Sequence, residues 1–350
     1  MTGVRAEYPV PVRGRTTVYF ARANPLPTTN TSREITVTLT TSVVIPAFNE
    51  SLRLAAGFER LRPVLEEMDP EQTEVIVVDD GSKDDTMHVA QRVYGHLPHV
   101  QFVQQPHNRG KGAAVRLGIS IASAPFVIAT DADLSIRPIH LPDIVVALHD
   151  SALAPGSRDQ DASDGYDTFL RTLAGRVFNH LVRHYTGTKL RDTQCGCKGF
   201  QLGPARILGL LGFYDRFVYD AEMFYLADQL GLAIRPVPVT WDDIAGSTVH
   251  VGRDSIQMVR DLRALRHRKY ENPVVELDVA IDVAAVDDAA RKSRVQGIVI
   301  ARGRDNALAV LPRDGAVAGV GIATALGGSL RTAGLAELRG RTYDAVTSRR

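Results

Sequence analysis

Short apolar runs alternate with helix-periodic segments along the first half of the chain. Four runs rich in branched or aromatic residues end at polar or turn signals, at 42–46, 74–78, 100–104 and 126–130. Between the first two, Leu54, Phe58, Leu61 and Leu65 recur at helical spacing. Strands alternating with helices in this way predict an α/β fold, a doubly wound and mostly parallel sheet with helices on both faces.

The alternation loosens after Pro138. Helices are expected at about 139–149, 166–185, 218–230 and 253–270. A short strand is expected to lead to 156–158, a loop that enters a strand is expected at 192–202, and a further strand is expected at 232–239. From about Asn272 the composition shifts to Ala, Val, Gly and Asp with few aromatics. We therefore expect an N-terminal arm over 1–40, the α/β domain over 41–271 and a small C-terminal extension of unassigned role over 272–350.

Composition excludes several classes of protein. The chain has 350 residues, is 44% hydrophobic and carries a net charge of +1, so no overall field points to nucleic acid. The two cysteines, Cys195 and Cys197, are too close in sequence for a good disulfide and form half a metal site, so buried thiols are expected. No run approaches the roughly 18–20 apolar residues of a spanning helix, which predicts a protein that is soluble or lies on a membrane surface.

The apolar run 126–130 ends in two carboxylates, Asp131 and Asp133. Open α/β sheets bind ligands at the carboxyl ends of their strands, and two carboxylates there repel each other unless a cation lies between them. The pair suits Mg²⁺ or Mn²⁺ with substrate phosphates completing the coordination shell. A solvated turn is the alternative, because Asp is common in turns.

Three strand ends are expected to meet at one sheet edge: 46–50, 79–82 and 131–133. A carboxylate after the second strand, Asp79 or Asp80, can accept hydrogen bonds from a base or ribose. The turn 108–112 opens a helix with Arg109 and Lys111, which offer charge to an anion. Each feature alone is also typical of a helix cap or turn. Their convergence favours a nucleotide-binding crevice.

Six ordered motifs carry a resemblance to a known family. Segments 43–50, 77–82, 108–112 and 130–134 resemble the successive motifs of the family 2 GT-A glycosyltransferases. Segments 192–198 and 239–241, with Gly246 and Ser247, are similar to the dolichyl-phosphate β-glucosyltransferase branch, which is related to the dolichyl-phosphate mannose synthases. The resemblance covers about residues 40–270 and implies a GT-A, Rossmann-like fold.

The resemblance also implies a donor site. Pro46, Phe48, Glu50 and Asp80 match positions that bind the base and ribose in that family. Asp131 and Asp133 match its metal-binding positions. The full set expected to bind the nucleotide sugar is Pro46, Phe48, Glu50, Asp79, Asp80, Arg109, Lys111, Asp131 and Ala132. The metal, Mg²⁺ or Mn²⁺, would neutralise charge on the leaving nucleoside diphosphate, which makes Asp133 a catalytic candidate.

On the acceptor side, Ser157, Arg158 and Arg171 resemble residues that bind a lipid phosphate, and Arg158 is also a catalytic candidate. Arginine suits this role because it pairs with phosphate in a bidentate way. Arg171 is alternatively a surface cation. Lys198 is either a further phosphate contact or a cation at a strand edge.

A general base is a separate question. A phosphate monoester already carries a charge of about −1.5 to −2 at pH 7, so its oxygen attacks without losing a proton, whereas a sugar hydroxyl needs a base. Asp220 is the catalytic candidate for that base, with Glu222 beside it. Charge placement at a helix N-terminus explains both acids equally well.

The sequence therefore predicts an inverting hexosyltransferase that moves glucose from UDP-glucose to a polyprenyl or dolichyl phosphate. The alternatives are GDP-mannose as donor, a soluble hydroxyl acceptor, or a nucleotide-sugar-binding module without activity. The N-terminal membrane helix of the eukaryotic members has no counterpart here, and Cys197 stands where the branch more often has an aromatic residue. Membrane contact is expected through basic amphipathic helices such as 253–269, on the cytoplasmic face. A charged face solvated over the core is the alternative for that helix.

Overall fold

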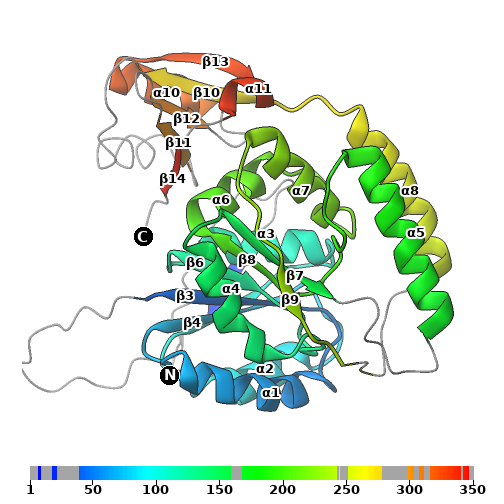
Figure 1. Cartoon of the computed structure of the whole chain (residues 1–350). Helices are drawn as coiled ribbons and strands as arrows, with labels where there is room; N and C mark the ends of the chain where they lie inside the picture. The colour runs from blue at the N-terminus through cyan, green and yellow to red at the C-terminus, as the bar shows by residue number, and fades with distance from the viewer. Residues whose placement is uncertain are drawn as a thin grey trace, which may run out of the picture.

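The structure is a computed structural model of the whole chain. It describes residues 39–158, 168–242, 244 and 251–277, and the shorter stretches 7–8, 18–21, 298–302, 307–310, 316–339 and 342–346. Two β-sheets and the helices around them make up this part of the chain (Figure 1).

The larger sheet has the strand order β1-β2-β5-β4-β3-β6-β8-β7-β9. Its strands are β1 (Glu7–Tyr8), β2 (Val18–Ala21), β3 (Thr41–Ala47), β4 (Thr73–Asp79), β5 (Val100–Gln104), β6 (Phe126–Ala129), β7 (Leu153–Arg158), β8 (Lys198–Gln201) and β9 (Val237–Val239). The four strands β5, β4, β3 and β6 are parallel, and β8 runs antiparallel to both β6 and β7. The predicted doubly wound, mostly parallel α/β fold is confirmed. The expected strand over 232–239 is shorter than predicted, because only an isolated bridge at Ile234 precedes β9.

Helices cover both faces of this sheet because its strands are apolar on both sides. Along β3, Val43 and Ile45 belong to one buried cluster and Val44 to the other, as the alternation of side chains in a strand requires. The helices of the first face are α1 (Leu54–Glu67), α2 (Thr86–Tyr94) and α4 (Leu141–Leu148), which follows the short helix η1 (Pro138–His140). The helices of the other face are α3 (Lys111–Ile121), α6 (Leu202–Leu211) and α7 (Tyr219–Leu230).

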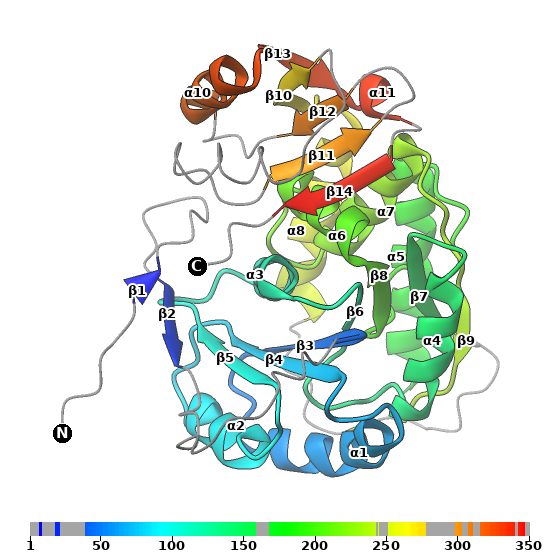
Figure 2. The ribbon, with the colours of Figure 1, turned by 90° about the vertical axis from the view of Figure 1, so that its left-hand side faces the viewer.

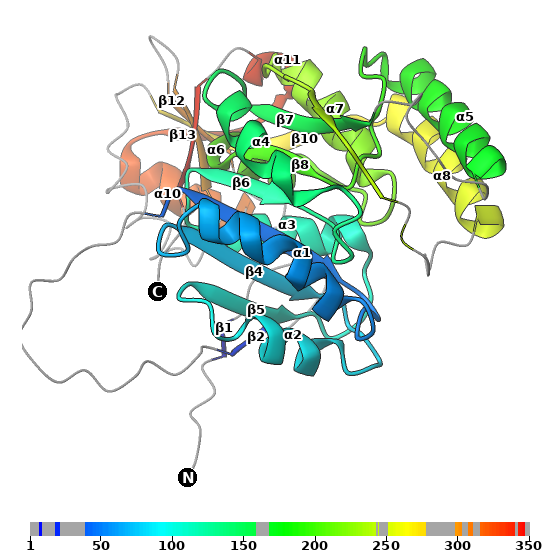
Figure 3. The same ribbon diagram turned by 60° about the horizontal axis from the view of Figure 1, so that its bottom comes forward.

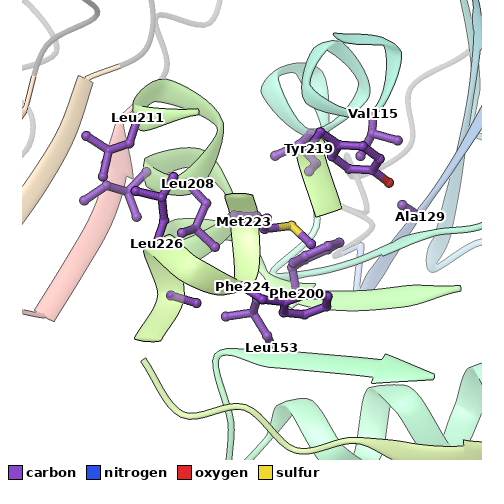
Figure 4. Close-up of a cluster of buried hydrophobic side chains, with 14 of the residues drawn as sticks. Val115, Ala129, Leu153, Phe200, Leu208, Leu211, Tyr219, Met223, Phe224 and Leu226 are labelled. Carbon is purple, nitrogen blue, oxygen red and sulfur yellow. The ribbon is translucent and has the colours of Figure 1, made fainter. Parts of the chain in front are cut away.

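The second face carries a large apolar cluster, shown in close-up in Figure 4. Phe200 of β8, Met223 and Phe224 of α7 and Leu208 of α6 gather there, and Phe200 and Phe224 are about 1% exposed. Burial of one such aromatic side chain contributes about 2–3 kcal/mol. The cluster fixes α7 against β8, and that contact places the N-terminus of α7 beside the sheet edge described below.

A second, antiparallel sheet packs over α6 and α7 (Figures 1 and 2). It contains β10 (Glu271–Leu277), β11 (Ile298–Arg302), β12 (Ala307–Val310), β13 (Ser329–Gly334) and β14 (Thr342–Val346), with the helices α10 (Ala316–Leu326) and α11 (Leu335–Leu338). Val274, Ala333 and Leu338 are buried in the same apolar cluster as α6 and α7. One continuous core therefore joins the two sheets.

Helices α5 (Thr168–Thr186) and α8 (Val251–Arg266) lie side by side at one flank of the molecule (Figures 1 and 3). Leu262 and Leu265 of α8 are fully buried, while Val259 is 38% exposed and Val177 of α5 is 51% exposed. Among the described helices, none is both long and apolar enough to cross a membrane.

Candidate active site

Three loops meet at the carboxyl edge of the parallel strands. Ala47 at the end of β3 is the register partner of Asp79 at the end of β4. Thr130, directly after β6, donates its backbone N–H to the carbonyl of Val44 at 3.0 Å. The loop after β3 (48–53) and the carboxylates after β6 therefore lie at the same edge, as the sequence predicts.

Glu50 lies in the loop after β3 and is electrostatically coupled to the carboxylates after β6. Its Oε1 accepts a 2.6 Å hydrogen bond from Arg53, whereas Oε2 is buried with no partner in the described part of the chain. Burial, together with the charges of Asp133 and Asp131, raises the pKa of Glu50 to about 7, despite the opposing effect of Arg53. Pro46 and Phe48 are half-buried beside it. One oxygen of the Glu50 carboxyl group is therefore left without a hydrogen bond among the described residues.

Asp79 and Asp80 are both buried and already hydrogen-bonded within the protein. Asp79 accepts from the backbone N–H of Ser82 at 2.9 Å and from Gln104 at 2.8 Å. The carboxylate of Asp80 accepts from Gln105, Asn108, the backbone of Arg109 and the backbone of Gly110, at 2.7–2.9 Å. Burial raises the pKa of Asp80, although the two backbone N–H groups oppose the shift. Its observed contacts shape the loop before α3.

Positive and negative side chains alternate between the end of β6 and the start of α7, in the order Asp131, Lys111, Asp220 and Lys198. Lys111 at the start of α3 forms an ion pair with Asp131. The ammonium of Lys198, 2% exposed, lies 2.9 Å from Oδ1 of Asp220 and also donates to the carbonyl of Cys195. Burial alone would lower the pKa of Lys111, but the charges of Asp131 and Asp220 outweigh it and raise that pKa. The row therefore carries two positive and two negative charges that balance one another.

Arg109 is held away from solvent by Asp215, in the loop before α7. Its Nη2 lies 3.0 Å from Oδ2 of Asp215, and Arg116 pairs with the other oxygen of the same carboxylate. Glu222, the neighbour of Asp220, also has a structural role. It accepts from the backbone N–H groups of Phe213 and Tyr214 and from the hydroxyl of Tyr270, at 2.6–2.8 Å.

The two carboxylates after β6 differ in their surroundings. The side chain of Asp131 is 34% exposed and that of Asp133 is 21% exposed. Asp133 accepts a 3.1 Å hydrogen bond from the backbone of Ser135, and its second oxygen is 3.7 Å from Arg53. Ala132 between them is buried. No three His, Cys, Asp or Glu side chains within the described residues form a metal-binding cluster, so a cation here would take two carboxylates from this strand end.

Arg158, at the end of β7, is paired side-on with the buried Asp192. Nε lies 2.7 Å from Oδ2, Nη2 lies 2.9 Å from Oδ1, and the backbone N–H of Arg158 donates to Oδ2 at 3.1 Å. Burial opposes both charges, but the pairing outweighs it, lowering the pKa of Asp192 and raising that of Arg158. The side chain of Arg158 is 33% exposed, and none of the described residues accepts a hydrogen bond from Nη1. Ser157 precedes it and is half-buried.

The loop between α5 and β8 packs against the carboxylates after β6. A side chain on Gly196 would place a Cβ atom 2.2 Å from Oδ2 of Asp131, so any larger residue there would displace that carboxylate. Cys195 and Cys197 are free and fully buried, as predicted. Burial raises the pKa of both thiols, that of Cys195 to about 11.

The structure brings most of the predicted site residues to one edge but leaves some elsewhere. Lys198 is buried against Asp220, which removes it from the surface position expected of a phosphate contact. Arg171 lies on α5, but its side chain is outside the described residues, as are Gly246 and Ser247. The sequence alone indicates no role for Asp192 or Asp215, since a single acid in a loop gives no sign of the arginine that it contacts in the fold.

Known proteins resemble the part of the chain that contains the larger sheet and this site. Residues 42–207 match the model of glycosyl transferase family 2. The dolichyl-phosphate beta-glucosyltransferase of Drosophila melanogaster is 36% identical, over 66% of this chain and 76% of the relative, and that of Homo sapiens is 34% identical, over 65% and 75%. A crystal structure described as a mycobacterial protein superposes with a TM-score of 0.50 at 18% identity, over 78% of this chain and 84% of the other. That last likeness shows the fold alone.

Proposed function

The chain belongs to glycosyl transferase family 2, in the branch of the dolichyl-phosphate beta-glucosyltransferases, and we propose that it transfers glucose from UDP-glucose to dolichyl or a related polyprenyl phosphate. Two relatives with this activity in their names align over 76% and 75% of their own lengths. The observation that carries the proposal is the side-on pairing of Arg158 with Asp192, next to the carboxylates after β6.

The donor would lie along the edge formed by the loops after β3, β4 and β6. Phe48 and Pro46 offer half-buried apolar surface for the base, and the carboxyl group of Glu50 offers an acceptor to a base or ribose donor. Asp79 and Asp80 would act through the loop they hold, because their oxygens are already in use within the protein. Lys111 would contribute positive charge close to the diphosphate.

The residues at this edge fit a divalent cation. Asp131 and Asp133 both retain exposed carboxylate surface, and Mg²⁺ or Mn²⁺ is commonly held by one or two carboxylates together with substrate phosphates. When bound, the cation would neutralise charge on the leaving nucleoside diphosphate. The ion pair with Lys111 would keep one oxygen of Asp131 oriented.

The acceptor phosphate would bind the free edge of Arg158. A guanidinium has five N–H donors, and side-on pairing through Nε and Nη2 leaves both N–H groups of Nη1 and one of Nη2. These three donors point away from the carboxylate and match the oxygens of a phosphate in a bidentate arrangement. Asp192 thus orients the arginine without occupying its outer edge.

The transfer needs no proton acceptor for its nucleophile. An oxygen of the lipid phosphate would form a bond to C1 of glucose while the bond from C1 to the diphosphate oxygen breaks and its electron pair leaves with the nucleotide. The phosphate oxygen is already anionic at pH 7. Attack opposite the leaving group inverts C1 and gives a β-linked product.

The hydroxyl-acceptor alternative needs a base, and Asp220 is its candidate. The side chain of Asp220 is 6% exposed and lies 2.9 Å from the ammonium of Lys198. The ammonium of Lys198 and the low exposure leave this carboxylate little access for an incoming hydroxyl acceptor. The geometry therefore favours a phosphate acceptor.

Transfer assays test the proposal directly. The purified chain is incubated with labelled UDP-glucose or GDP-mannose, Mn²⁺ or Mg²⁺, and dolichyl phosphate in detergent. We expect a glucosyl lipid from UDP-glucose, much less product with Asp133→Asn or Arg158→Ala, and unchanged product with Arg62→Ala, an exposed arginine of α1. Absence of lipid-linked sugar with either donor and either metal would refute the assignment.

Helices α5 and α8 are the proposed membrane contact. Over 177–191 and 257–269 the sequence carries eight arginines and lysines against one acid, Asp261. The exposed cations of α8 and the residues after it, none ion-paired in the part of the chain that is described, are Arg260, Arg263, Arg266 and Lys269. Because Leu262 and Leu265 face the core, attraction would come mainly from charge, about 1 kcal/mol for each cation near an anionic surface.

Vesicle sedimentation tests this contact. We expect binding to vesicles that contain phosphatidylglycerol and not to phosphatidylcholine alone, weakened by added salt and by Arg260→Glu with Arg263→Glu. The matched control is Arg62→Glu with Arg92→Glu on α1 and α2. Equal binding by the two double variants would refute the role of α8.

A further inference from the structure

Hydrogen bonds to two consecutive residues, Asp192 and Thr193, connect the interior of α5 with Arg158. Asn179 lies on α5 with 5% exposure. Its Oδ1 accepts from the hydroxyl of Thr193 at 2.9 Å and from the backbone N–H of Thr193 at 3.2 Å. Thr193 is fully buried. One side-chain oxygen on the helix therefore holds both the backbone and the side chain of a residue in the loop before β8.

The next residue toward the N-terminus is Asp192, which holds Arg158. Its carboxylate accepts four hydrogen bonds, three from Arg158 and one from the backbone N–H of Gln194 at 3.1 Å. A rotation of the backbone at Thr193 would turn this carboxylate and the guanidinium with it. Fixing Thr193 is therefore a means of fixing Arg158.

We propose that Asn179 is a positioning residue for acceptor transfer, acting through Thr193 and Asp192 on the guanidinium of Arg158. The inference rests on the proposed function, in which Arg158 binds the acceptor phosphate. Arg158 is 33% exposed at the edge of the sheet, so its own packing does not fix the side chain, and Asp192 needs a rigid backbone to do so. Because Asn179 belongs to α5, the position of this helix affects the arginine that receives the phosphate.

Thr193 allows a matched test. Thr193→Val keeps the shape of the side chain and removes the hydroxyl, and Thr193→Ser keeps the hydroxyl. Thr73→Val, which removes a buried hydroxyl that donates to the carbonyl of Met68 at 3.1 Å, controls for the general cost of such a loss. Measured quantities are the thermal midpoint, the KM for UDP-glucose and kcat/KM for dolichyl phosphate.

We expect Thr193→Val and Asn179→Ala to lower kcat/KM for dolichyl phosphate by about 10- to 100-fold, because small misplacements of a reacting group cost about that much. The KM for UDP-glucose should change no more than in Thr73→Val, the thermal midpoint of Thr193→Val should match that of Thr73→Val, and Thr193→Ser should retain most of the activity. In an Arg158→Ala background, Thr193→Val should have no further effect, since its action passes through the missing guanidinium.

Two results would overturn this role. One is a loss in Thr193→Val that is no larger than in Thr73→Val or that falls equally on donor and acceptor. The other is an undiminished effect of Thr193→Val when Arg158 is absent. Failure of the wild-type chain to glucosylate dolichyl phosphate would instead overturn the proposed function itself, so the two failures are distinguishable.

Discussion

Asp192→Asn is the substitution that most directly tests how Arg158 is held. The replacement has almost the same shape but turns one carboxylate oxygen into an NH₂ group. With one orientation of the amide, the backbone N–H and Nε of Arg158 lose their acceptor; with the other, Nη2 of Arg158 and the backbone of Gln194 lose theirs. Two of the four hydrogen bonds are lost either way, and of the remaining two only the one from the guanidinium still has a charged partner.

The loss of stability follows from these contacts. A hydrogen bond to a charged group contributes about 1.5–3 kcal/mol, and the lower end applies because Arg158 is 33% exposed, so two lost bonds cost about 3 kcal/mol. The thermal midpoint should fall by about 4 °C, because the entropy of unfolding grows with chain length. The pKa of Asp192 is below its usual value because pairing with Arg158 outweighs burial. The unfolded chain therefore binds the proton more tightly, so the contribution is complete above about pH 4 and is lost as the pH falls through the native pKa.

Chemical unfolding of wild-type and variant chains from pH 8 down to pH 3.5 measures both effects. The difference in free energy of unfolding should be constant between pH 8 and pH 5 and should shrink below about pH 4. Asp228→Asn, at an exposed position of α7, is the control and should stay within about 0.5 kcal/mol of wild type. A difference that grows on acidification, or a variant as stable as the control, would show that the ion pair does not hold the loop as described.

Three further outcomes are expected. Gly196→Ala should displace Asp131, because the new Cβ would collide with its carboxylate. The affinity for Mn²⁺, measured by electron paramagnetic resonance, should therefore fall while the thermal midpoint changes little. Unchanged Mn²⁺ binding would contradict this. Lys198→Met should destabilise the fold by about 3–5 kcal/mol, because it leaves the carboxylate of Asp220 buried and unpaired. In urea unfolding, adding Asp220→Leu should restore much of that loss. Additive losses in the double variant would count against the ion pair. Cys195 should resist iodoacetamide at pH 8 in the native chain and react in urea, by mass spectrometry, because its thiol is buried with a pKa near 11; native labelling would contradict that burial.

Much of the fold could be predicted from the sequence because its signals are local. Strands β3, β4 and β6 are continuous apolar runs buried on both faces, and the helices between them repeat with helical spacing, so period and order together specify a parallel sheet. Short β9 was harder to delimit, since three residues carry little periodicity. The C-terminal segment matched no motif, so its sequence allowed either a small αβ module or a flexible tail; the structure forms a sheet there.

For the candidate site, too, local sequence signals predict some residues and not others. The carboxylates Asp131 and Asp133 follow a strand directly, so topology alone places them at the ligand edge. By contrast, the partners of Arg158, Lys111 and Lys198 are set by contacts between segments distant in the chain. A charged residue in a sequence does not reveal whether the fold will supply it with a counter-ion. Lys198 illustrates this: the sequence allows either a phosphate contact or a cation at a strand edge, and only the fold shows that its ammonium pairs with the buried Asp220.

The shared apolar core of the two sheets has a consequence for how the molecule unfolds. Val274 and Leu338 are buried against the helices that present Asp220, and Tyr270, just before β10, bonds to Glu222. Neither sheet can leave the other without exposing apolar surface to water, so both should melt in a single cooperative transition. A chain cut after residue 269 would aggregate rather than persist as a trimmed enzyme.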